Sequence, residues 1–208
     1  MSELIFYTNP MSRGRIARWM LEEVGAPYET RLVDWAAKPD DFLAANPMGK
    51  VPTIVHDGRT VSEAGAIIAY LADAFPEAGL APIAAERADY YRWMFFAAGP
   101  VEAAITNRSL GVAPSAEQQG MVGYGSLDRV IETLKRAVSA HEFIAGDRFT
   151  AADVYVGSHI GWGKQFGALP ACDEFDAYLA RVMERPAAVR AREIDDALIA
   201  AASATPGG

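Results

Sequence analysis

NPMGKVPTIVHDGRTVSEAGAIIAYL, residues 46–71, is the stretch of this chain that decides the fold. Two short β-compatible runs flank Asp57-Gly58, a dipeptide typical of tight hairpin turns. The residues that follow repeat apolar side chains at helical spacing, and Pro76 ends that pattern. The stretch therefore predicts an antiparallel hairpin followed by a helix.

The residues before this stretch alternate between strand and helix patterns. An apolar run at 4–7 ends at Asn9-Pro10, as expected for a buried strand followed by a turn. Apolar residues at helical spacing follow over 16–24, then β-compatible residues at 28–33 and a short helix at 41–45. Two parallel strands combined with a hairpin predict a small mixed sheet with helices on its faces, an α/β domain.

The second half of the chain predicts helices alone. Gly99-Pro100 predicts a kink in the first of them, because proline removes a helical hydrogen bond. Thr150 and Asp153 predict a capping box at a helix start. The expected domains are 1–76, a linker at 77–85 and an all-α domain at 86–208, with a disordered tail from 203. The expected helices lie at 86–109, 116–140, 151–166, 173–184 and 187–202.

Composition and charge exclude several classes of function. The formal net charge is −8, from 27 acidic and 19 basic residues, which argues against a nucleic-acid partner. One cysteine, Cys172, and three histidines argue against a disulfide and a four-ligand zinc site. We find no secretory signal and no apolar run long enough to span a bilayer. A cytoplasmic location without membrane or metal is expected.

The turn after the first predicted strand carries a serine at a helix start. Ser12 lies where backbone N–H groups and the helix dipole favour negative charge. Its hydroxyl can donate a hydrogen bond to a bound thiolate and lower the pKa of that thiol. Serine is also a common helix N-cap, and the residues alone leave both interpretations open.

Two further turns are suited to a peptide-like ligand. Pro52 opens a strand, so either the Val51-Pro52 bond is cis and turns the preceding backbone outward, or Pro52 is a trans proline in an edge strand. Glu63 begins the helix after the hairpin. Its carboxylate is either a ligand for an ammonium group or a solvated charge.

Together the three turns resemble a known family. Gly-Lys-Val-Pro-Thr at 49–53, the hairpin and Ser-Glu-Ala-Gly-Ala-Ile-Ile-Ala-Tyr-Leu at 62–71 resemble the N-terminal domain of cytosolic glutathione transferases. Phe-Thr-Ala-Ala-Asp at 149–153 resembles the capping motif of their helical domain. The resemblance covers nearly the whole chain and implies a thioredoxin-like domain that binds glutathione, followed by an all-α domain.

The resemblance also implies roles for single residues. The backbone of Val51, before a cis Pro52, is expected to pair with the cysteinyl part of glutathione, and Glu63 is expected to contact the γ-glutamyl end. Ala64 stands where the family usually has a serine that binds the γ-glutamyl carboxylate. The backbone N–H of Ala64 can still donate, but one charge-assisted hydrogen bond of about 1.5–3 kcal/mol is missing, which predicts weakened binding.

Two lysines are candidates for the glycyl carboxylate of glutathione. They are Lys38 and Lys50, and the alternative for each is a plain solvated charge. Within the family, Met11-Ser12 resembles the serine-type theta and phi enzymes, and the turn lacks the cysteine of the omega and beta kinds. The spacing from Ser12 to Arg15 is shorter than in theta and phi enzymes. Asn9 is therefore the alternative thiol-activating residue.

The resemblance further implies an acceptor-substrate pocket between the domains, although each aromatic residue in it has a core position as its alternative. The expected lining residues are Met11, Trp35, Trp93, Phe96, Trp162 and Phe166. The leading hypothesis is a detoxifying transferase that adds the thiolate of glutathione, its co-substrate, to a small apolar electrophile. The alternatives are a glutathione-dependent isomerase or peroxidase, and a non-catalytic interaction protein. A homodimer is implied, with contacts from helices at 66–75 and 90–96.

Overall fold

The computed structural model describes residues 3–204. The described residues form two compact units. Residues 3–80 and 185–204 make up an α/β unit, and Ala81–Glu184 make up a helical unit. The α/β class of the first half and the all-helical character of the second are both confirmed.

The sheet of the α/β unit is mixed, as predicted. Its strands run in the order β2-β1-β3-β4, with β1 and β2 parallel and the other pairs antiparallel. Asp57 (φ 48°) and Gly58 (φ 74°) are both left-handed, the conformation that a two-residue hairpin turn requires. The strands are β1 (Leu4–Thr8), β2 (Glu29–Leu32), β3 (Thr53–His56) and β4 (Arg59–Ser62).

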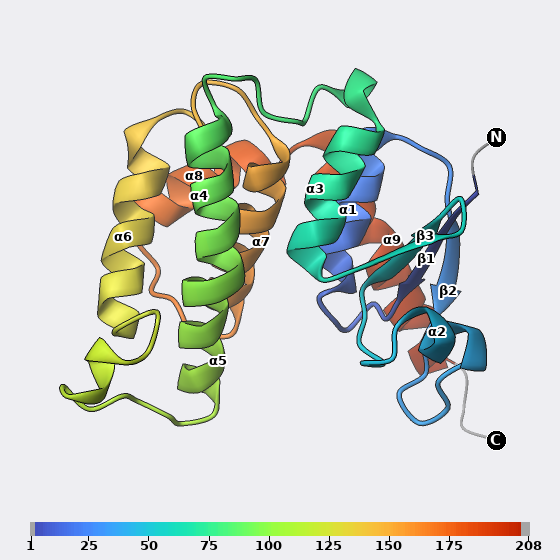
Figure 1. The fold of residues 1–208 in the computed structure, drawn as a ribbon, viewed down its shortest axis with the longest axis horizontal. Helices are drawn as coiled ribbons and strands as arrows, with labels where there is room; N and C mark the ends of the chain where they lie inside the picture. Colours follow the sequence, from blue (N-terminus) through green and yellow to red (C-terminus); the bar gives the residue numbers. More distant parts are fainter. Residues whose placement is uncertain (1–2, 205–208) are drawn as a thin grey trace. The chain divides into compact units, whose positions relative to one another are not determined.

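Helices cover both faces of this sheet. α1 and α3 lie on one face and α2 on the other (Figure 1). Phe42 of α2 is fully buried with Ile5 and Tyr7 of β1. On the opposite face Gly14 lets α1 approach β1 closely, because a Cβ there would collide with the Thr8 hydroxyl. The helices are α1 (Gly14–Val24), α2 (Asp40–Ala45), α3 (Ala64–Ala74) with the 3₁₀ turn η1 (Pro76–Ala78), and α9 (Pro186–Ala204).

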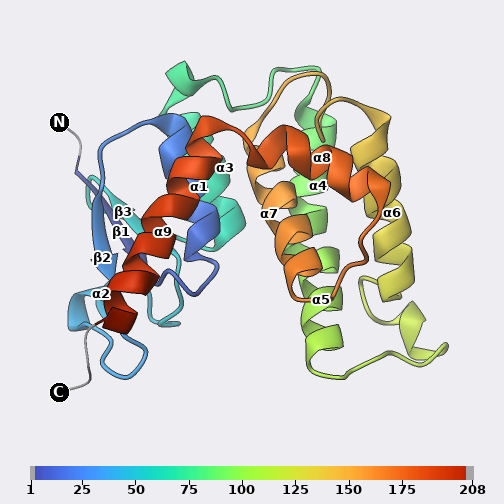
Figure 2. The ribbon, with the colours of Figure 1, turned by 180° about the vertical axis from the view of Figure 1, so that it is seen from behind.

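The last helix belongs to the α/β unit, which differs from the predicted domain at 86–208. α9 lies along α1 (Figure 2). Nε of Arg18 on α1 donates to Oδ1 of Asp195 on α9 at 2.7 Å, and both side chains are 1% exposed. Buried charges must be paired, so this ion pair ties the end of the chain to the first helix. The predicted tail from 203 lies largely outside the described residues, while 203–204 complete α9.

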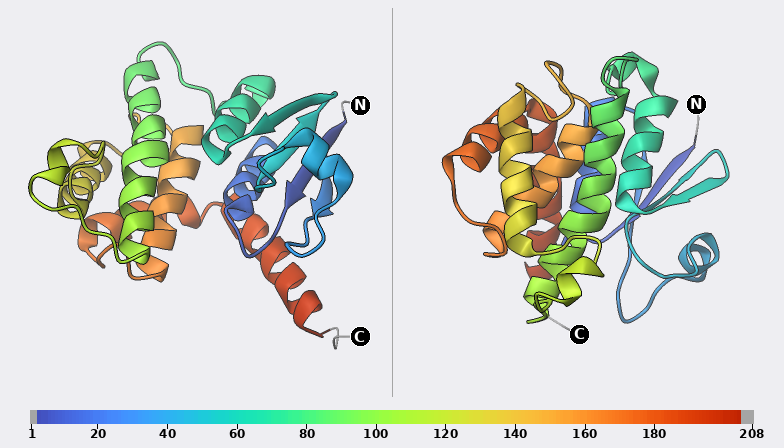
Figure 3. Two further views of the ribbon diagram at one scale, coloured as in Figure 1. Left: turned by 60° about the horizontal axis from the view of Figure 1, so that its bottom comes forward. Right: turned by 60° about the vertical axis from the view of Figure 1, so that its left-hand side comes forward.

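The helical unit contains all the remaining helices, and α4, α6 and α7 run side by side in it (Figure 3). At Gly99-Pro100 the first long helix changes to a π-helical turn, where the hydrogen bond removed by proline is accommodated. The elements are α4 (Arg87–Phe96), the π turn η2 (Ala97–Val101), α5 (Glu102–Ser109), the 3₁₀ turn η3 (Gln118–Gly120), α6 (Leu127–Ala140), α7 (Ala151–Gln165) and α8 (Asp173–Met183).

One helix start was predicted wrongly and another correctly. The helix expected from 116 begins at 127, because three glycines lie between 120 and 125 and Ser126 caps α6 by accepting the N–H of Arg129. The capping box of α7 is present. Asp153 accepts the N–H of Thr150 at 2.9 Å and the hydroxyl of Tyr178 at 2.8 Å. Across 3–204, no helix combines the length and apolarity that a membrane span needs.

Candidate functional site

Three of the predicted site segments meet at one end of the sheet. Tyr7 of β1 is paired with Thr53 of β3, and Thr53 is paired with Ser62 of β4. The turn after β1, the residues before β3 and the start of α3 therefore all lie at the same sheet end. The register thus brings together segments that are about forty and ten residues apart in sequence. It does so without involving the helical unit.

The turn at Ser12 is built from local hydrogen bonds. α1 begins at Gly14, so Ser12 lies two residues before the helix rather than opening it as predicted. Its Oγ donates to the carbonyl of Asn9 at 2.6 Å and accepts the N–H of Gly14 at 2.9 Å. The hydroxyl is half-buried. It thus braces the turn, as a cap would, and its proton points to a neutral carbonyl.

The alternative residue, Asn9, braces the same turn from the other side. Its amide Nδ2 donates to the carbonyl of Val33 at 3.1 Å, and its Oδ1 accepts the N–H of Met11 at 2.9 Å. Asn9 therefore connects the end of β1 to the loop after β2. Over the described range 3–204 the second hydrogen of this amide has no acceptor, and it can be donated to a further group.

The proline prediction is confirmed. The Val51-Pro52 bond is cis. Asn46, buried at the end of α2, holds the carbonyl of Lys50 with Nδ2 at 2.9 Å and the Thr53 hydroxyl at 3.0 Å. Within 3–204 no hydrogen bond uses the backbone N–H or C=O of half-buried Val51. The backbone of Val51 is thereby available to pair with an extended ligand.

Glu63 has a feature that sequence reasoning missed. Its φ of 68° is unusual for a residue other than glycine. Strained backbone of this kind costs about 1–3 kcal/mol and clusters at ligand sites. Glu63 is the N-cap of α3 but makes no side-chain cap hydrogen bond. Within residues 3–204 no side chain caps the first amides of α3, which begin with Ala64, and they form a place for an anion.

The two predicted lysines differ in their surroundings. Lys50 is exposed. Lys38 is half-buried, and its Nζ would lie 3.1 Å from a Cβ at Gly49, whose φ is 57°. Among the described residues Lys38 has no ionic or hydrogen-bonding partner. The glycine at 49 thus lets an uncompensated ammonium group lie against the segment that leads to Val51.

The residues predicted for the acceptor pocket divide between the two units. Met11 and Trp35 belong to the α/β unit and are exposed. The other four belong to the helical unit, where Trp93 is buried with Phe96 edge-on at 5.6 Å and Phe166 is exposed. Trp162 is half-buried. A shared pocket stays a prediction.

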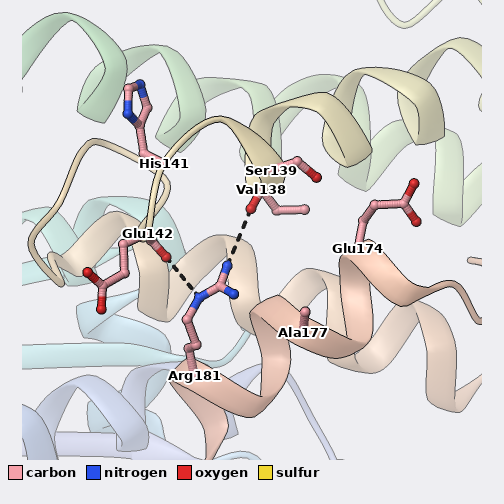
Figure 4. A pocket seen from close by; sticks show the side chains of 7 residues that line it. All are labelled: Val138, Ser139, His141, Glu142, Glu174, Ala177 and Arg181. Atoms are coloured by element: carbon pink, nitrogen blue, oxygen red, sulfur yellow. Dashed lines mark hydrogen bonds between the residues drawn. The ribbon is translucent and has the colours of Figure 1, made fainter.

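A separate hollow of about 220 Å³ in the helical unit contains none of the predicted residues (Figure 4). It lies between α6 and α8. Its Arg181 donates to the carbonyl of Glu142 at 3.0 Å and to that of Val138 at 3.4 Å, and so joins α8 to the end of α6. We interpret the hollow as part of the packing contact between these two helices. In the part of the chain that the structure describes, no three acidic, histidine or cysteine side chains gather as a metal site would require.

The sequence and the fold are both similar to those of known proteins. The model of the glutathione S-transferase N-terminal domain matches residues 11–74. Glutathione S-transferase GstA of Escherichia coli O157:H7 is 29% identical over 188 residues, 86% of this chain and 90% of that protein. Glutathione S-transferase 3 of Zea mays is 31% identical over 168 residues, 74% and 75% of the two chains. A sphingomonad glutathione S-transferase solved with glutathione has a TM-score of 0.75 at 28% identity, covering 92% and 98% of the chains. The chain belongs to the glutathione S-transferase family.

Proposed function

We propose that this protein adds the thiolate of glutathione to a small apolar electrophile. The observation that carries the proposal is the meeting of three turns at one sheet end, where the Val51 backbone and the start of α3 lie at the same end as the turn of Ser12. A tripeptide with a carboxylate at each end and a thiol between them matches those groups in chemistry. The bacterial and plant relatives named as glutathione S-transferases support the same assignment.

Glutathione would lie along the sheet end with its γ-glutamyl group at the start of α3 and its glycyl group at Lys38. The cysteinyl backbone pairs with Val51. The γ-glutamyl carboxylate takes the N–H groups at the start of α3, and Glu63 takes the γ-glutamyl ammonium group. Lys38 binds the glycyl carboxylate, and exposed Lys50 adds weaker long-range attraction. Because Ala64 supplies no hydroxyl, the affinity for glutathione is expected to be modest.

Activation of the thiol is assigned to Ser12. In the structure the Ser12 proton is donated to the carbonyl of Asn9. A thiolate nearby competes for that proton, because a charged acceptor forms a stronger hydrogen bond than a neutral carbonyl. Asn9 is the alternative donor through its remaining amide hydrogen. Catalysis then consists of stabilising the thiolate and placing it beside the acceptor.

An apolar acceptor fits the surroundings of this turn. Met11 is 78% exposed and Trp35 is 50% exposed. Both follow strands whose ends are paired, since Thr8 of β1 lies beside Leu32 of β2. Exposed apolar side chains next to a polar turn are typical of a ligand site. We propose that Trp93, Phe96, Trp162 and Phe166 also contact the acceptor.

A panel of acceptors with glutathione tests the reaction type. In a substitution, the sulfur–carbon bond forms as the halide leaves and the thiol proton passes to water. Aryl halides or epoxides should be turned over, and hydroperoxides should not. Turnover of hydroperoxides alone would establish the peroxidase alternative. Binding without turnover of any acceptor would favour an interaction protein, the alternative suggested by Ala64.

We further propose a cytoplasmic homodimer that uses α3 and the α4 segment from Tyr90 to Phe96. Tyr91 and Phe95 expose apolar surface one turn apart on α4, and such stripes are typical of interfaces. Sedimentation at micromolar concentration should give twice the 22.4 kDa chain mass. A single monomeric species would contradict the dimer without touching the proposed reaction.

A further inference from the structure

Tyr7 carries a buried hydroxyl that the proposed thiol activation does not use. Its ring lies against Phe42 of α2, with ring centroids 5.4 Å apart. The hydroxyl donates to Oδ2 of Asp41 at 2.8 Å. Nη1 of Arg31 donates to the same hydroxyl at 3.1 Å and to the same carboxylate oxygen at 2.8 Å. Tyr7, Arg31 and Asp41, here named the Tyr7 cluster, thus join β1, β2 and α2.

Burial is the main reason why the Tyr7 hydroxyl keeps its proton, and Arg31 opposes the effect. Burial, together with the hydrogen bond to Asp41, raises the pKa of Tyr7 above its usual value. The hydrogen bond from Tyr7 lowers the pKa of Asp41, and Arg31 lowers it further. The hydroxyl is therefore a lasting neutral donor to a carboxylate. A tyrosine that activates a thiol would instead have to direct its hydroxyl to the sulfur.

Asp41 lies in the first turn of α2, three residues after Lys38. The helical hydrogen bonds begin beside it, since the carbonyl of the N-cap residue Pro39 accepts the N–H of Leu43 at 3.0 Å. A fixed Asp41 consequently fixes the short connection to Lys38. The ammonium group of Lys38 in turn lies against Gly49, on the segment that precedes Val51. A short path of covalent and hydrogen bonds therefore connects the Tyr7 hydroxyl with this ammonium group.

We propose that Tyr7 is a positioning residue for recognition of the glycyl carboxylate. Its hydroxyl holds Asp41 and the start of α2, so that Lys38 keeps its place over Gly49. The inference rests on the proposed function, because it concerns how the same site recognises the glycyl end of glutathione. It assigns Tyr7 no contact with the thiol.

The inference makes the effect of Tyr7 ligand-specific. γ-Glutamylcysteine has the same γ-glutamyl group and thiol as glutathione but lacks the glycine, so its second carboxylate is on the cysteine, one residue short of the glycyl position. If Tyr7 acts through Lys38, removal of its hydroxyl should affect glutathione and spare the dipeptide. If the hydroxyl only stabilised the sheet end, the affinities for both ligands should fall together. A fall in melting temperature would accompany either case and does not distinguish them.

Calorimetric titration of the whole protein with each ligand tests this. For Tyr7→Phe we expect the Kd for glutathione to rise about three- to tenfold, the range for loss of one ordinary hydrogen bond, while the Kd for γ-glutamylcysteine stays within about twofold. Lys38→Met should show the same selectivity. Tyr28→Phe is the matched control, because its hydroxyl contacts Glu22 and Arg18 and not α2. It should change neither constant.

Asp41→Asn provides a second variant if Tyr7→Phe does not fold. It removes the negative charge of the carboxylate that accepts the Tyr7 hydroxyl. The affinity for glutathione should fall selectively, as for Tyr7→Phe. Equal weakening of both ligands, or no change for glutathione in a folded variant, would overturn the inference while leaving the proposed function intact. Failure of the wild-type protein to bind either ligand would overturn the proposed function itself, and the inference with it.

Discussion

Removal of the Ser12 hydroxyl should raise the pKa of the bound glutathione thiol by about one unit. A charge-assisted hydrogen bond contributes about 1.5–3 kcal/mol, but Ser12 gives up its existing bond to the Asn9 carbonyl, worth about 0.5–1.5 kcal/mol. The difference is about 1–2 kcal/mol. Since 1.36 kcal/mol corresponds to one pKa unit, Ser12→Ala should shift the thiol by roughly one.

The assay is a pH titration of the thiolate absorbance of glutathione bound to wild type and to Ser12→Ala. Turnover measured at a pH below both thiol pKa values should fall about tenfold in parallel, because the thiolate fraction falls tenfold for each unit. Folding should be little affected. The Gly14 N–H loses its acceptor, which costs about 1 kcal/mol and about 2–4 °C in Tm.

Asn9→Ala is the comparison that decides between the two candidates. It breaks the braces to Val33 and Met11, so some loss of turnover is expected through misplacement of the turn. The thiol pKa should stay at its wild-type value. Identical thiol pKa values in wild type and Ser12→Ala would show that Ser12 only braces the turn. A shift found in Asn9→Ala instead would assign activation to Asn9.

Other predictions concern stability and are checked by denaturant unfolding. Asp153→Ala leaves four buried donors without their acceptor and should cost about 3–5 kcal/mol, with no change in the Kd for glutathione. Arg18→Met leaves Asp195 buried and unpaired, and should lower the free energy of unfolding by a similar amount. The double variant Arg18→Met, Asp195→Leu should recover most of the lost stability. A double variant as unstable as Arg18→Met would refute this explanation. Burial opposes ionisation of Glu86, yet Arg148 lowers its pKa below 4.5. A lowered pKa adds stability above about pH 4.5 that is lost on acidification, so Glu86→Gln should destabilise at pH 7 and differ little from wild type near pH 3. An equal difference at both pH values would contradict that assignment.

Much of the fold could be predicted because it depends on local chemistry. A two-residue hairpin turn at Asp57-Gly58 requires both residues to be left-handed, and both have that conformation. The capping box of α7 is a pattern within four residues and was found for that reason. The start of α6 was missed because the helix predicted over 116–140 includes three glycines near its start, whose backbone freedom favours irregular structure.

The site was less predictable because its details depend on register and on residues far apart in sequence. The pairing of Tyr7 with Asp41 spans 34 residues, and that of Arg18 with Asp195 spans 177. Neither has a local pattern. The strained backbone of Glu63 also leaves no signal in the residue type, since glutamate is not a residue that favours positive φ. Resemblance to a family identified the residues, and only the structure supplied their hydrogen-bond partners.

Mapping glutathione onto the backbone amides by nuclear magnetic resonance tests the central claim most directly. The claim is that one sheet end of the α/β unit binds glutathione. Titration should produce saturable shifts at the amides of Val51, Ala64 and Ser12, and at Lys38, before any amide of the hollow between α6 and α8 responds. Saturable shifts confined to the helical unit, or no shifts at millimolar glutathione, would contradict the account.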